Sequence, residues 1–539
     1  MRHSCEGSAL QILLVLAYLA SFVACGGGSS NQTLPPPARA TSYYLDCSST
    51  ASGSGTQGSP WNSLTSANAF AFQPGDSLLL KRGTTCSGSL VPQGSGKDGA
   101  PIIIDAYGTG ARPIIDGGMN EEAIRLLNQQ YWEINNLEVE GGNLFGIYVS
   151  GDQDKAVLNH IYFRNLDVHG AHYASVAHGD SGELLIHADG TTTLNDILID
   201  GISAHDSLTS DGIQVIGAAF TPPYNSSIVL GSNVTIQNST AHDVCNVGIL
   251  VMSVNDGFIQ NNVGFNTGLC PHQTATDAIG CVTCANFIMQ NNESYANQAD
   301  EPYDGGGFAL DTNALDSIVQ YNYGHDSMGY CIGHFAGPAV ASLNNVIRYN
   351  VCSNDGQKDS LSYQGEIVVS GGSFDGVQIY NNTFYWNPVG DGPAIYAPNA
   401  LYSGTNPNFF KNNIIYSTAP TMINMTADLS LDNNIYWTTS GTVPTWQIGS
   451  NIYAGFTAYQ AGTGRDSHSF YVEPMMDSPT YHEVGRPTTA FTLMPGSPAV
   501  GNGANVCTGI SGCSMGNQDF WGNALPNGSG YSIGAYQPQ

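Results

Sequence analysis

Hydrophobic and polar positions alternate in short runs along most of this chain. Runs such as 317–321 and 377–380 are rich in β-branched and aromatic residues, and glycine or polar turns bound them. No run in the repeated part of the chain has the length or the 3.6-residue period of a helix. The pattern predicts many short strands and an all-β protein.

A polar phrase that ends in asparagine closes one strand after another. Its last residues recur every 28 to 32 positions, at Asn262, Asn292, Asn322, Asn350, Asn382 and Asn413. A repeat of this length indicates a solenoid, because a propeller blade needs roughly 40–45 residues. An asparagine at the same inward turn of each coil can bond to the coils above and below it. We therefore predict a parallel β-helix of about ten coils.

The regions outside the repeat predict a division into five segments. Residues 42–125 are expected to form an N-terminal cap with the first strands, 126–434 the repeated coils, and 435–539 the last coils and a C-terminal cap. Residues 1–25 are typical of a signal peptide, and 26–41 of a flexible tether.

The signal peptide ends in a way that predicts a lipid anchor. Arg2 and His3 precede an apolar run, and Cys25 follows Ala24 as in a bacterial lipobox. Phe22 stands where leucine is usual. We expect an exported protein anchored through Cys25 to the outer membrane or cell surface, with secretion as the alternative. Apart from this anchor we expect no membrane contact.

Acidic residues dominate the charge. The formal net charge is −29, and no Lys or Arg occurs from 165 to 347. Nucleic acid and anionic membranes are therefore poor partners. We expect a monomer whose partner is a polysaccharide, either neutral or held through Ca²⁺.

Export permits disulfides, and two pairs are predicted within the terminal segments. These are Cys47 with Cys86 and Cys507 with Cys513. Cys281 and Cys284 have the spacing of half a zinc site, but no second such pair follows them, which favours a structural role.

Several carboxylates fall near one predicted strand edge. When coils are aligned on Gly280 and Gly307, Asp277 and Asp304 both lie three residues earlier, which predicts a separation of about 4.8 Å. Two carboxylates that close raise a pKa or bind a cation. Asp300 and Glu301 would complete a possible Ca²⁺ site with them.

The same face supplies candidates for acid–base chemistry. Asp311 and His334 end consecutive strands, and Asp211 and Glu366 (aligned through Gly365) flank the group. Glycoside hydrolysis needs one carboxylic acid and one carboxylate. The predicted catalytic residues are Asp211, Asp304, Asp311, His334 and Glu366. Tyr303, Tyr330 and Tyr363 are expected to be exposed and able to stack on sugars.

Three histidine–aspartate pairs also have the composition of catalytic dyads. They are His205-Asp206, His242-Asp243 and His325-Asp326. Because Asn297 and Asn354 fill the same turn in other coils, we interpret the pairs as a structural column.

Three phrases carry a resemblance to a known family. They are the cap segment 74–83, the coil 304–308 with 320–326, and the ending 533–536. On these the chain resembles the pectin-lyase-like superfamily, which implies a right-handed parallel β-helix with caps. The superfamily includes hydrolases, lyases, epimerases and adhesins, so the resemblance leaves the reaction open.

Three functions follow as expectations. The first is a glycoside hydrolase that cleaves an extracellular polysaccharide and requires no cofactor. The second is a Ca²⁺-dependent polysaccharide lyase, for which Lys358 is the base nearest the seam. The third is a non-catalytic glycan-binding or adhesin-like surface protein.

Overall fold

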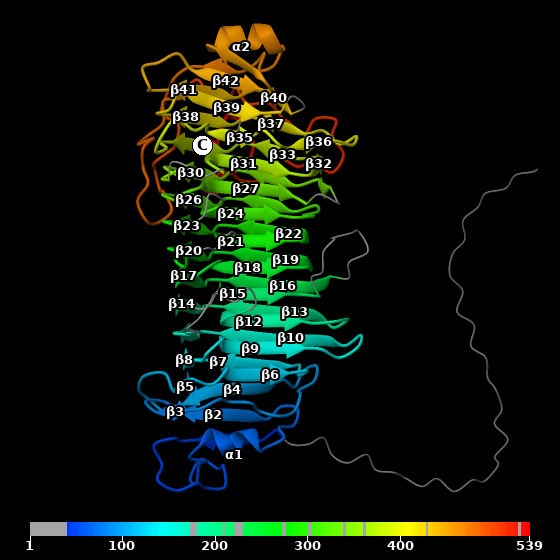
Figure 1. The fold of residues 1–539 in the computed structure, drawn as a ribbon, viewed down its shortest axis with the longest axis vertical. Helices are drawn as coiled ribbons and strands as arrows, with labels where there is room; N and C mark the ends of the chain where they lie inside the picture. Colours follow the sequence, from blue (N-terminus) through cyan, green and yellow to red (C-terminus); the bar gives the residue numbers. More distant parts are fainter. Residues whose placement is uncertain are drawn as a thin grey trace, which may run out of the picture. The chain divides into compact units, whose positions relative to one another are not determined.

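The computed structural model describes residues 40–172, 181–208, 211–219, 230–271, 276–299, 304–337, 341–358, 363–426, 429–526 and 530–539. All of them belong to one compact unit, Ala40–Gln539. Within these residues the chain winds through three long sheets, and each regular coil adds one strand to each sheet (Figure 1). The predicted all-β, right-handed parallel β-helix is confirmed.

The strands of each sheet are stacked in sequence order. In the described residues, sheet 1 consists of β1 (Ser42–Leu45), β2 (Ser77–Lys81), β4 (Ile102–Tyr107), β7 (Trp132–Asn135), β10 (Val157–Arg164), β13 (Thr193–Asp200), β16 (Gly231–Gln237), β19 (Val254–Gln260), β22 (Ala285–Gln290), β25 (Ile318–Gln320), β29 (Val346–Arg348), β33 (Gln378–Tyr380), β37 (Phe409–Lys411) and β40 (Ser430–Asp432).

Sheet 2 follows sheet 1 in each coil. Its described strands are β3 (Thr85–Ser87), β5 (Ile114–Gly118), β8 (Glu138–Gly141), β11 (Asp167–His169), β14 (Ser203–Ser207), β17 (Thr240–Val244), β20 (Val263–Phe265), β23 (Glu293–Tyr295), β26 (Tyr323–His325), β30 (Val351–Ser353), β34 (Thr383–Trp386), β38 (Ile414–Ser417), β41 (Ile435–Thr438) and β44 (Phe470–Tyr471).

Sheet 3 completes the coil, and it carries most of the predicted site residues. Its described strands are β6 (Glu122–Leu127), β9 (Phe145–Gly151), β12 (Gly182–Ala188), β15 (Asp211–Ile216), β18 (Ile249–Met252), β21 (Asp277–Val282), β24 (Gly306–Asp311), β27 (Tyr330–Ala336), β31 (Gly365–Gly371), β35 (Ile395–Ala397), β39 (Thr421–Met425), β42 (Thr445–Ile448) and β43 (Asn451–Ala454). A small separate sheet holds β28 (Ser342–Leu343), β32 (Ser373–Asp375) and β36 (Leu401–Tyr402).

The solenoid is longer than the ten coils expected. Sheets 1 and 2 each have 14 strands in the described part of the chain, and sheet 3 has 13. The difference arises because β1, β2 and β4 in the N-terminal segment already pair in parallel, and β41 and β42 continue the stack beyond residue 434.

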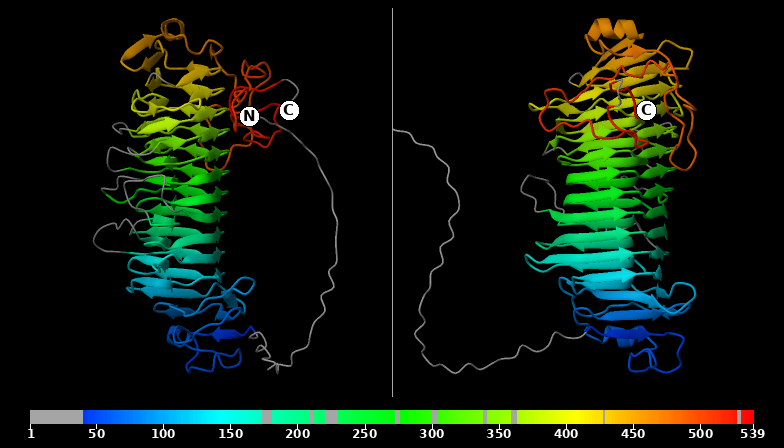
Figure 2. Two further views of the ribbon diagram at one scale, coloured as in Figure 1. Left: turned by 90° about the vertical axis from the view of Figure 1, so that its right-hand side faces the viewer. Right: turned by 180° about the vertical axis from the view of Figure 1, so that it is seen from behind.

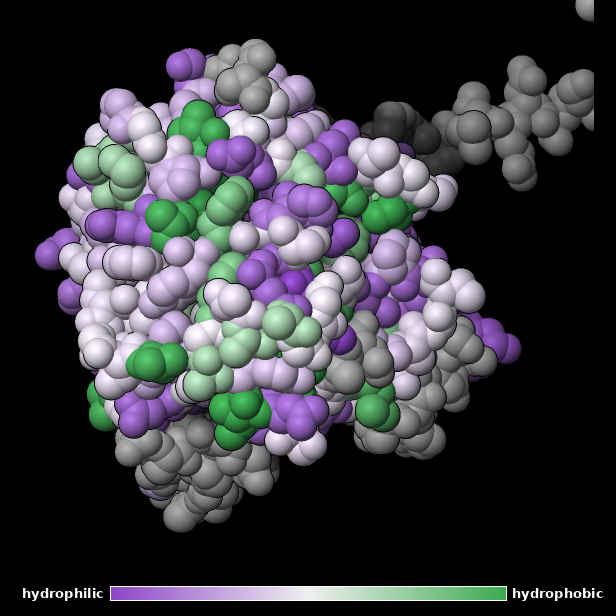
Figure 3. Space-filling model, turned by 90° about the horizontal axis from the view of Figure 1, so that it is seen from above, coloured by the Kyte–Doolittle hydropathy of each residue, from purple (hydrophilic) through white to green (hydrophobic). Residues whose placement is uncertain are grey.

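Other elements lie at the two ends. The short helix α1 (Leu64–Asn68) lies at the N-terminal end, and α2 (Phe456–Thr463) with the antiparallel strand β43 lies at the other. In α2, Tyr459 stacks on Trp446 of β42, with ring centroids 5.3 Å apart. The view onto this end shows hydrophilic and hydrophobic residues interspersed on its surface (Figure 3). Such a cover protects the open end of a sheet.

The predicted asparagine column is present between sheets 1 and 2. The Asn292 Oδ1 accepts bonds from the Asn262 backbone N (2.9 Å) and Nδ2 (3.1 Å), and Asn262 Nδ2 also donates to the Ile236 carbonyl (2.9 Å). The pattern repeats through Asn322, Asn350, Asn382, Asn413 and Asn434. All of these side chains are buried. Each amide thus satisfies buried backbone groups of the neighbouring coil.

The C-terminal segment returns along the outside of the stack. After β44 the chain runs back beside earlier coils, as the orange and red segments show in Figure 2. Tyr321 donates its hydroxyl to the Gln518 carbonyl (3.1 Å), and Asn381 Nδ2 donates to the Ser532 and Gly534 carbonyls (2.8 and 3.0 Å). These bonds hold the last residues of the chain against coils that precede them by more than a hundred residues.

Five disulfides occur in the described residues. The two predicted pairs, Cys47–Cys86 and Cys507–Cys513, are formed. The others are Cys245–Cys270, Cys281–Cys284 and Cys331–Cys352, which confirms a structural role for the Cys281 and Cys284 pair. Disulfides persist in oxidising compartments and agree with export. The lipid anchor at Cys25 lies outside the described residues and stays a prediction.

None of the helices in the described residues has the length and apolar character that crossing a bilayer requires.

Candidate active site

Three of the predicted carboxylates come together on sheet 3. Asp277 begins β21, Asp311 ends β24, and Asp304 lies two residues before β24. All three are partly exposed, whereas Phe308 and Leu310 of β24 point into the core. We call Asp277, Asp304 and Asp311 the outer carboxyl cluster.

Tyr330 of β27 joins the cluster from the next coil. Its hydroxyl donates to Asp277 Oδ1 at 2.6 Å and lies 3.5 Å from Asp304 Oδ1. The ring passes over Gly306, where a Cβ atom would lie only 2.1 Å from it. A glycine is therefore required at this position for Tyr330 to reach Asp277. The expected exposure of Tyr330 is wrong, since the side chain is fully buried, and Tyr303 lies outside the described residues.

Burial and mutual repulsion raise the pKa of the cluster. Burial first, and then the charge of Asp311, raise the pKa of Asp277 to about 7. Burial, followed by the charges of Asp277 and Asp311, raises the pKa of Asp304 to about 8. Burial also raises the pKa of Asp311. None of the ion pairs found among the described residues supplies a cation to these carboxylates.

The three carboxyls of the cluster differ in the hydrogen bonds that they accept. Asp311 Oδ1 accepts from the Thr312 backbone N (2.6 Å) and Oγ1 (2.8 Å), and Asp277 accepts the short bond from Tyr330. Donors of this kind stabilise the ionised form. Among the described residues, the Asp304 side chain accepts only the long 3.5 Å contact from Tyr330. The proton of the cluster therefore resides preferentially on Asp304, while Asp277 and Asp311 are better suited to carry charge.

A pocket of about 410 Å³ lies next to the cluster. Its lining comprises Gly268, Leu269, Pro271, Gln298, Ala299, Met328 and Lys358. A Cβ on Gly305, the residue after Asp304, would lie 2.9 Å from the Cβ of Ala299 in its wall. The Lys358 Nζ donates to the Ala299 carbonyl in the same wall. The pocket thus lies beside the backbone that carries Asp304, at the start of β24, whereas Asp311 lies at the other end of that strand.

Glu366 does not belong to this face, and its predicted place was wrong. The register aligns Ile367 with Ile332 and Phe308, so that Glu366 lies in the column of Cys331 and Gly307. That column points inward. Glu366 is fully buried beside Asp355. Burial, and then the charge of Asp355, raise the pKa of Glu366, while burial raises the pKa of Asp355 to about 7. We call Asp355 and Glu366 the inner carboxyl pair.

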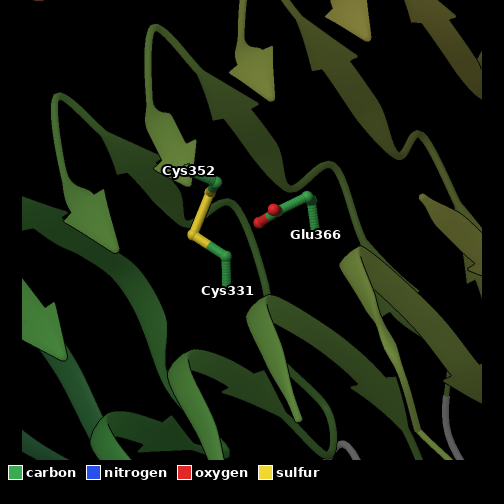
Figure 4. Close-up of side chains that lie close together, drawn as sticks. All are labelled: Cys331, Cys352 and Glu366. Atoms are coloured by element: carbon green, nitrogen blue, oxygen red, sulfur yellow. A yellow bond between two sulfur atoms is a disulfide. The ribbon is translucent and has the colours of Figure 1, made fainter. Parts of the chain in front are cut away.

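The inner pair lies against a disulfide. Figure 4 shows the carboxyl of Glu366 beside the Cys331–Cys352 bond. These three side chains form the one group in the described residues whose potential ligand atoms lie within 4.8 Å of one another. Metal binding by cysteine needs thiolates, which a disulfide does not offer. We therefore assign no metal to this group.

His334 is also internal, contrary to expectation. It pairs with Leu310 in the register, one residue before Asp311, and therefore faces the core. Its Nδ1 donates to the Leu310 carbonyl (3.2 Å), and its Nε2 accepts from Asn345 Nδ2 (3.3 Å). Burial lowers the pKa of His334 to about 4. The imidazole is neutral and has a structural role.

Asp211 lies in the column of Asp277 but two coils away. Strand β18 separates β15 from β21. The Asp211 Oδ1 accepts from Asn246 Nδ2 (3.0 Å) and the Val247 backbone N (3.1 Å), and the side chain is buried. Two coil steps amount to about 10 Å, which places Asp211 beyond the outer carboxyl cluster.

The structure describes only two of the four residues predicted to bind Ca²⁺, Asp277 and Asp304. Asp300 and Glu301 lie outside the described residues. Asp277 and Asp304 do not form, with Asp311, a group whose ligand atoms all lie within 4.8 Å. The expected alignment was also displaced, because Asp277 pairs with Gly306 and not with Asp304. A Ca²⁺ site here stays a prediction.

The histidine–aspartate pairs form a structural column at the end of sheet 2. The Nδ1 atoms of His205, His242 and His325 lie 2.8, 2.6 and 2.7 Å from the adjacent Asp206, Asp243 and Asp326. Rings stack from coil to coil at 4.6–5.1 Å, in the order His169, His205, His242, Phe265, Tyr295 and His325.

The turn beyond these rings is left-handed in each coil. Asp206, Asp243 and Asp326 have φ near +55°, and Ala296 and Asn354 occupy the same turn in their coils. Asn297, expected at this turn, lies one residue beyond it. The histidine–aspartate pairs therefore recur because each coil has a left-handed turn position that follows the stacked ring.

Comparison with known proteins identifies the fold. No protein-family model matches the sequence, and no curated protein matches it. A GH136 lacto-N-biosidase from Eubacterium ramulus superimposes with a TM-score of 0.53 at 19% identity, over 70% of this chain and 68% of that one. The pectate lyase Pel9A matches over 93% and 96% with a TM-score of 0.42 at 17% identity. The chain has a parallel β-helix fold, as the resemblance implied.

Proposed function

We propose that this protein is a glycoside hydrolase that cleaves an extracellular polysaccharide at the outer carboxyl cluster. The observation that carries the proposal is the set of three partly exposed aspartates with raised pKa values, of which Asp304 adjoins the wall of a pocket. Titratable groups perturbed in this way are concentrated at functional sites. The solved enzymes of similar fold include a lacto-N-biosidase, which supports carbohydrate as the substrate class.

The proposed roles follow from the hydrogen bonds. Asp304, with a pKa of about 8, is protonated at neutral pH and donates its proton to the leaving glycosidic oxygen. Asp311, which accepts two bonds from Thr312, acts as the carboxylate that activates water or attacks the sugar. Tyr330 positions Asp277, whose charge keeps the proton on Asp304.

A second candidate is a polysaccharide lyase. Lys358 lines the same pocket and is the base that such a reaction would use. Its Nζ donates to the Ala299 carbonyl, which holds it near the segment that leads to Asp304. A lyase would need Ca²⁺ to attach an acidic polymer to so acidic a face.

Digestion of a polysaccharide panel tests the proposal. Hydrolysis releases reducing ends without absorbance near 235 nm, whereas a lyase generates unsaturated products. New reducing ends on a neutral polymer support the hydrolase. Unsaturated products that disappear with a chelator would establish the lyase. Binding without products would leave a glycan-binding or adhesin-like protein as the function.

A further inference from the structure

A groove on the outer face of sheet 1 lies apart from the candidate active site on sheet 3. It encloses about 300 Å³ and spans β10, β13, β16, β19 and β22. Its lining consists of Tyr162, Asp196, Ile197, Leu198, Asn233, Thr235, Asp256, Gly257, Phe258 and Asn286. We call it the sheet 1 groove. A volume of this size is at the lower end of small-molecule sites.

The hollow arises from one column of side chains. Tyr162, Leu198, Thr235 and Phe258 are aligned in four successive coils. The short Thr235 stands between larger neighbours and leaves the depression. The column spans three coil steps, about 14 Å, with an aromatic ring at each end. Phe258 remains 40% exposed, so that its ring is available to a ligand.

A row of polar side chains borders the hollow. Asp196, Asn233, Asp256 and Asn286 occupy equivalent left-handed positions, with φ between +50° and +60°. The Asp196 carboxylate is fixed by the Tyr162 hydroxyl at 2.6 Å and by His160 Nδ1 at 2.9 Å. A carboxylate has about four acceptor positions, so fixed carboxylates of this kind can still accept sugar hydroxyls.

The chemistry of the lining selects a ligand class. No Lys or Arg is among the lining residues, and two aspartates are. A uronic acid or another anion would be repelled. We infer that the sheet 1 groove is a second, non-catalytic site for a neutral glycan, in which one pyranose ring packs on Phe258 and its hydroxyls bond to Asp196 and Asp256. The site goes beyond the proposed hydrolase, because it retains polymer on another face and raises its effective concentration.

Affinity electrophoresis of the full chain tests the groove. The parent is Asp304→Asn, whose turnover is expected to be at least about 10²-fold slower, and the probes are β-glucan, galactomannan and arabinoxylan, with polygalacturonate as the acidic polymer. Phe258→Ala and Thr235→Phe should weaken binding of the neutral polymer at least about tenfold. Phe258→Tyr should keep the affinity of the parent. Leu401→Ala, a control at a residue that is 60% exposed elsewhere, should also keep it.

Several results would overturn the inference. These are retention of the parent's affinity by Phe258→Ala, no retardation of the parent by any neutral polymer, or tightest binding to polygalacturonate. Unchanged melting temperatures show that the variants fold. Because binding is measured separately from turnover, an absence of hydrolytic activity would count against the proposed function and leave this result intact.

Discussion

The outer carboxyl cluster and the inner carboxyl pair differ in surroundings, although burial raises pKa values in both. Asp277, Asp304 and Asp311 are partly exposed beside a pocket, with Tyr330 and Thr312 as donors. Asp355 and Glu366 are fully buried against a disulfide. A raised pKa by itself therefore does not identify a catalytic acid in this fold. Access for a substrate separates the two groups, and each experiment below tests that distinction.

The largest effect is expected for Asp304→Asn. The variant cannot donate the proton to the leaving oxygen, and the rate should fall at least about 10²-fold. The melting temperature should stay the same or rise, because a repelled carboxyl is removed. Reducing-end release on the polymer found by the panel measures the rate. Full activity of this variant would exclude Asp304 as the acid.

Tyr330→Phe should have an intermediate effect. The variant loses the 2.6 Å bond that stabilises ionised Asp277, so the pKa of Asp277 should rise. We expect a roughly tenfold lower rate and a shift to lower pH of the limb on which Asp304 loses its proton, because a less ionised Asp277 raises the pKa of Asp304 less. A pH–rate profile shows both changes. An unshifted profile with a lower rate would indicate that Tyr330 only packs against Gly306.

Stability should depend on pH through both groups. Unfolded aspartates titrate near pH 4, whereas Asp277 and Asp355 have pKa values of about 7 and Asp304 of about 8. The folded state therefore binds more protons within this window, and the free energy of unfolding falls as pH rises from about 4 to about 8. Melting temperatures at pH 5 and pH 8 should show this loss. Asp304→Asn should reduce it, and an unchanged difference would contradict the raised pKa.

The smallest effect on activity is expected for Glu366→Gln. Glutamine replaces a carboxyl of the same shape that is already neutral, so the rate should stay within about twofold of wild type. The variant should also weaken the pH dependence of the melting temperature. A large loss of rate at an unchanged melting temperature would show that the inner carboxyl pair takes part in the reaction.

The repeats allowed the fold and the shared face of three candidate site residues to be predicted. The asparagine column established the coil length, and Asp277, Asp304 and Asp311 were placed on one face. Glu366 was misplaced because Gly365 was aligned with Gly307, whereas the register aligns Glu366 with it. A slip of one residue moves a side chain to the other face of a sheet.

The sequence did not predict the position of two side chains, Tyr330, which it named only as an exposed tyrosine, and Asp355. The role of Tyr330 depends on its ring crossing Gly306 to the next coil but one, a contact that appears only when the coils are stacked. Asp355 follows a turn asparagine and resembles other turn residues. Its place beside Glu366 becomes apparent only in the structure, where both side chains are fully buried.

The returning C-terminal segment has a consequence for the order of folding. The groups to which it binds, such as Tyr321 and Asn381, leave the ribosome well before Gln518, Ser532 and Gly534 do. Coils can stack one by one during synthesis, but this segment can attach only to a stack that already exists. The last residues to be translated therefore bind to coils that were translated much earlier. A chain truncated after β44 would retain the strands of all its coils but lose the hydrogen bonds that the returning segment makes to Tyr321 and Asn381.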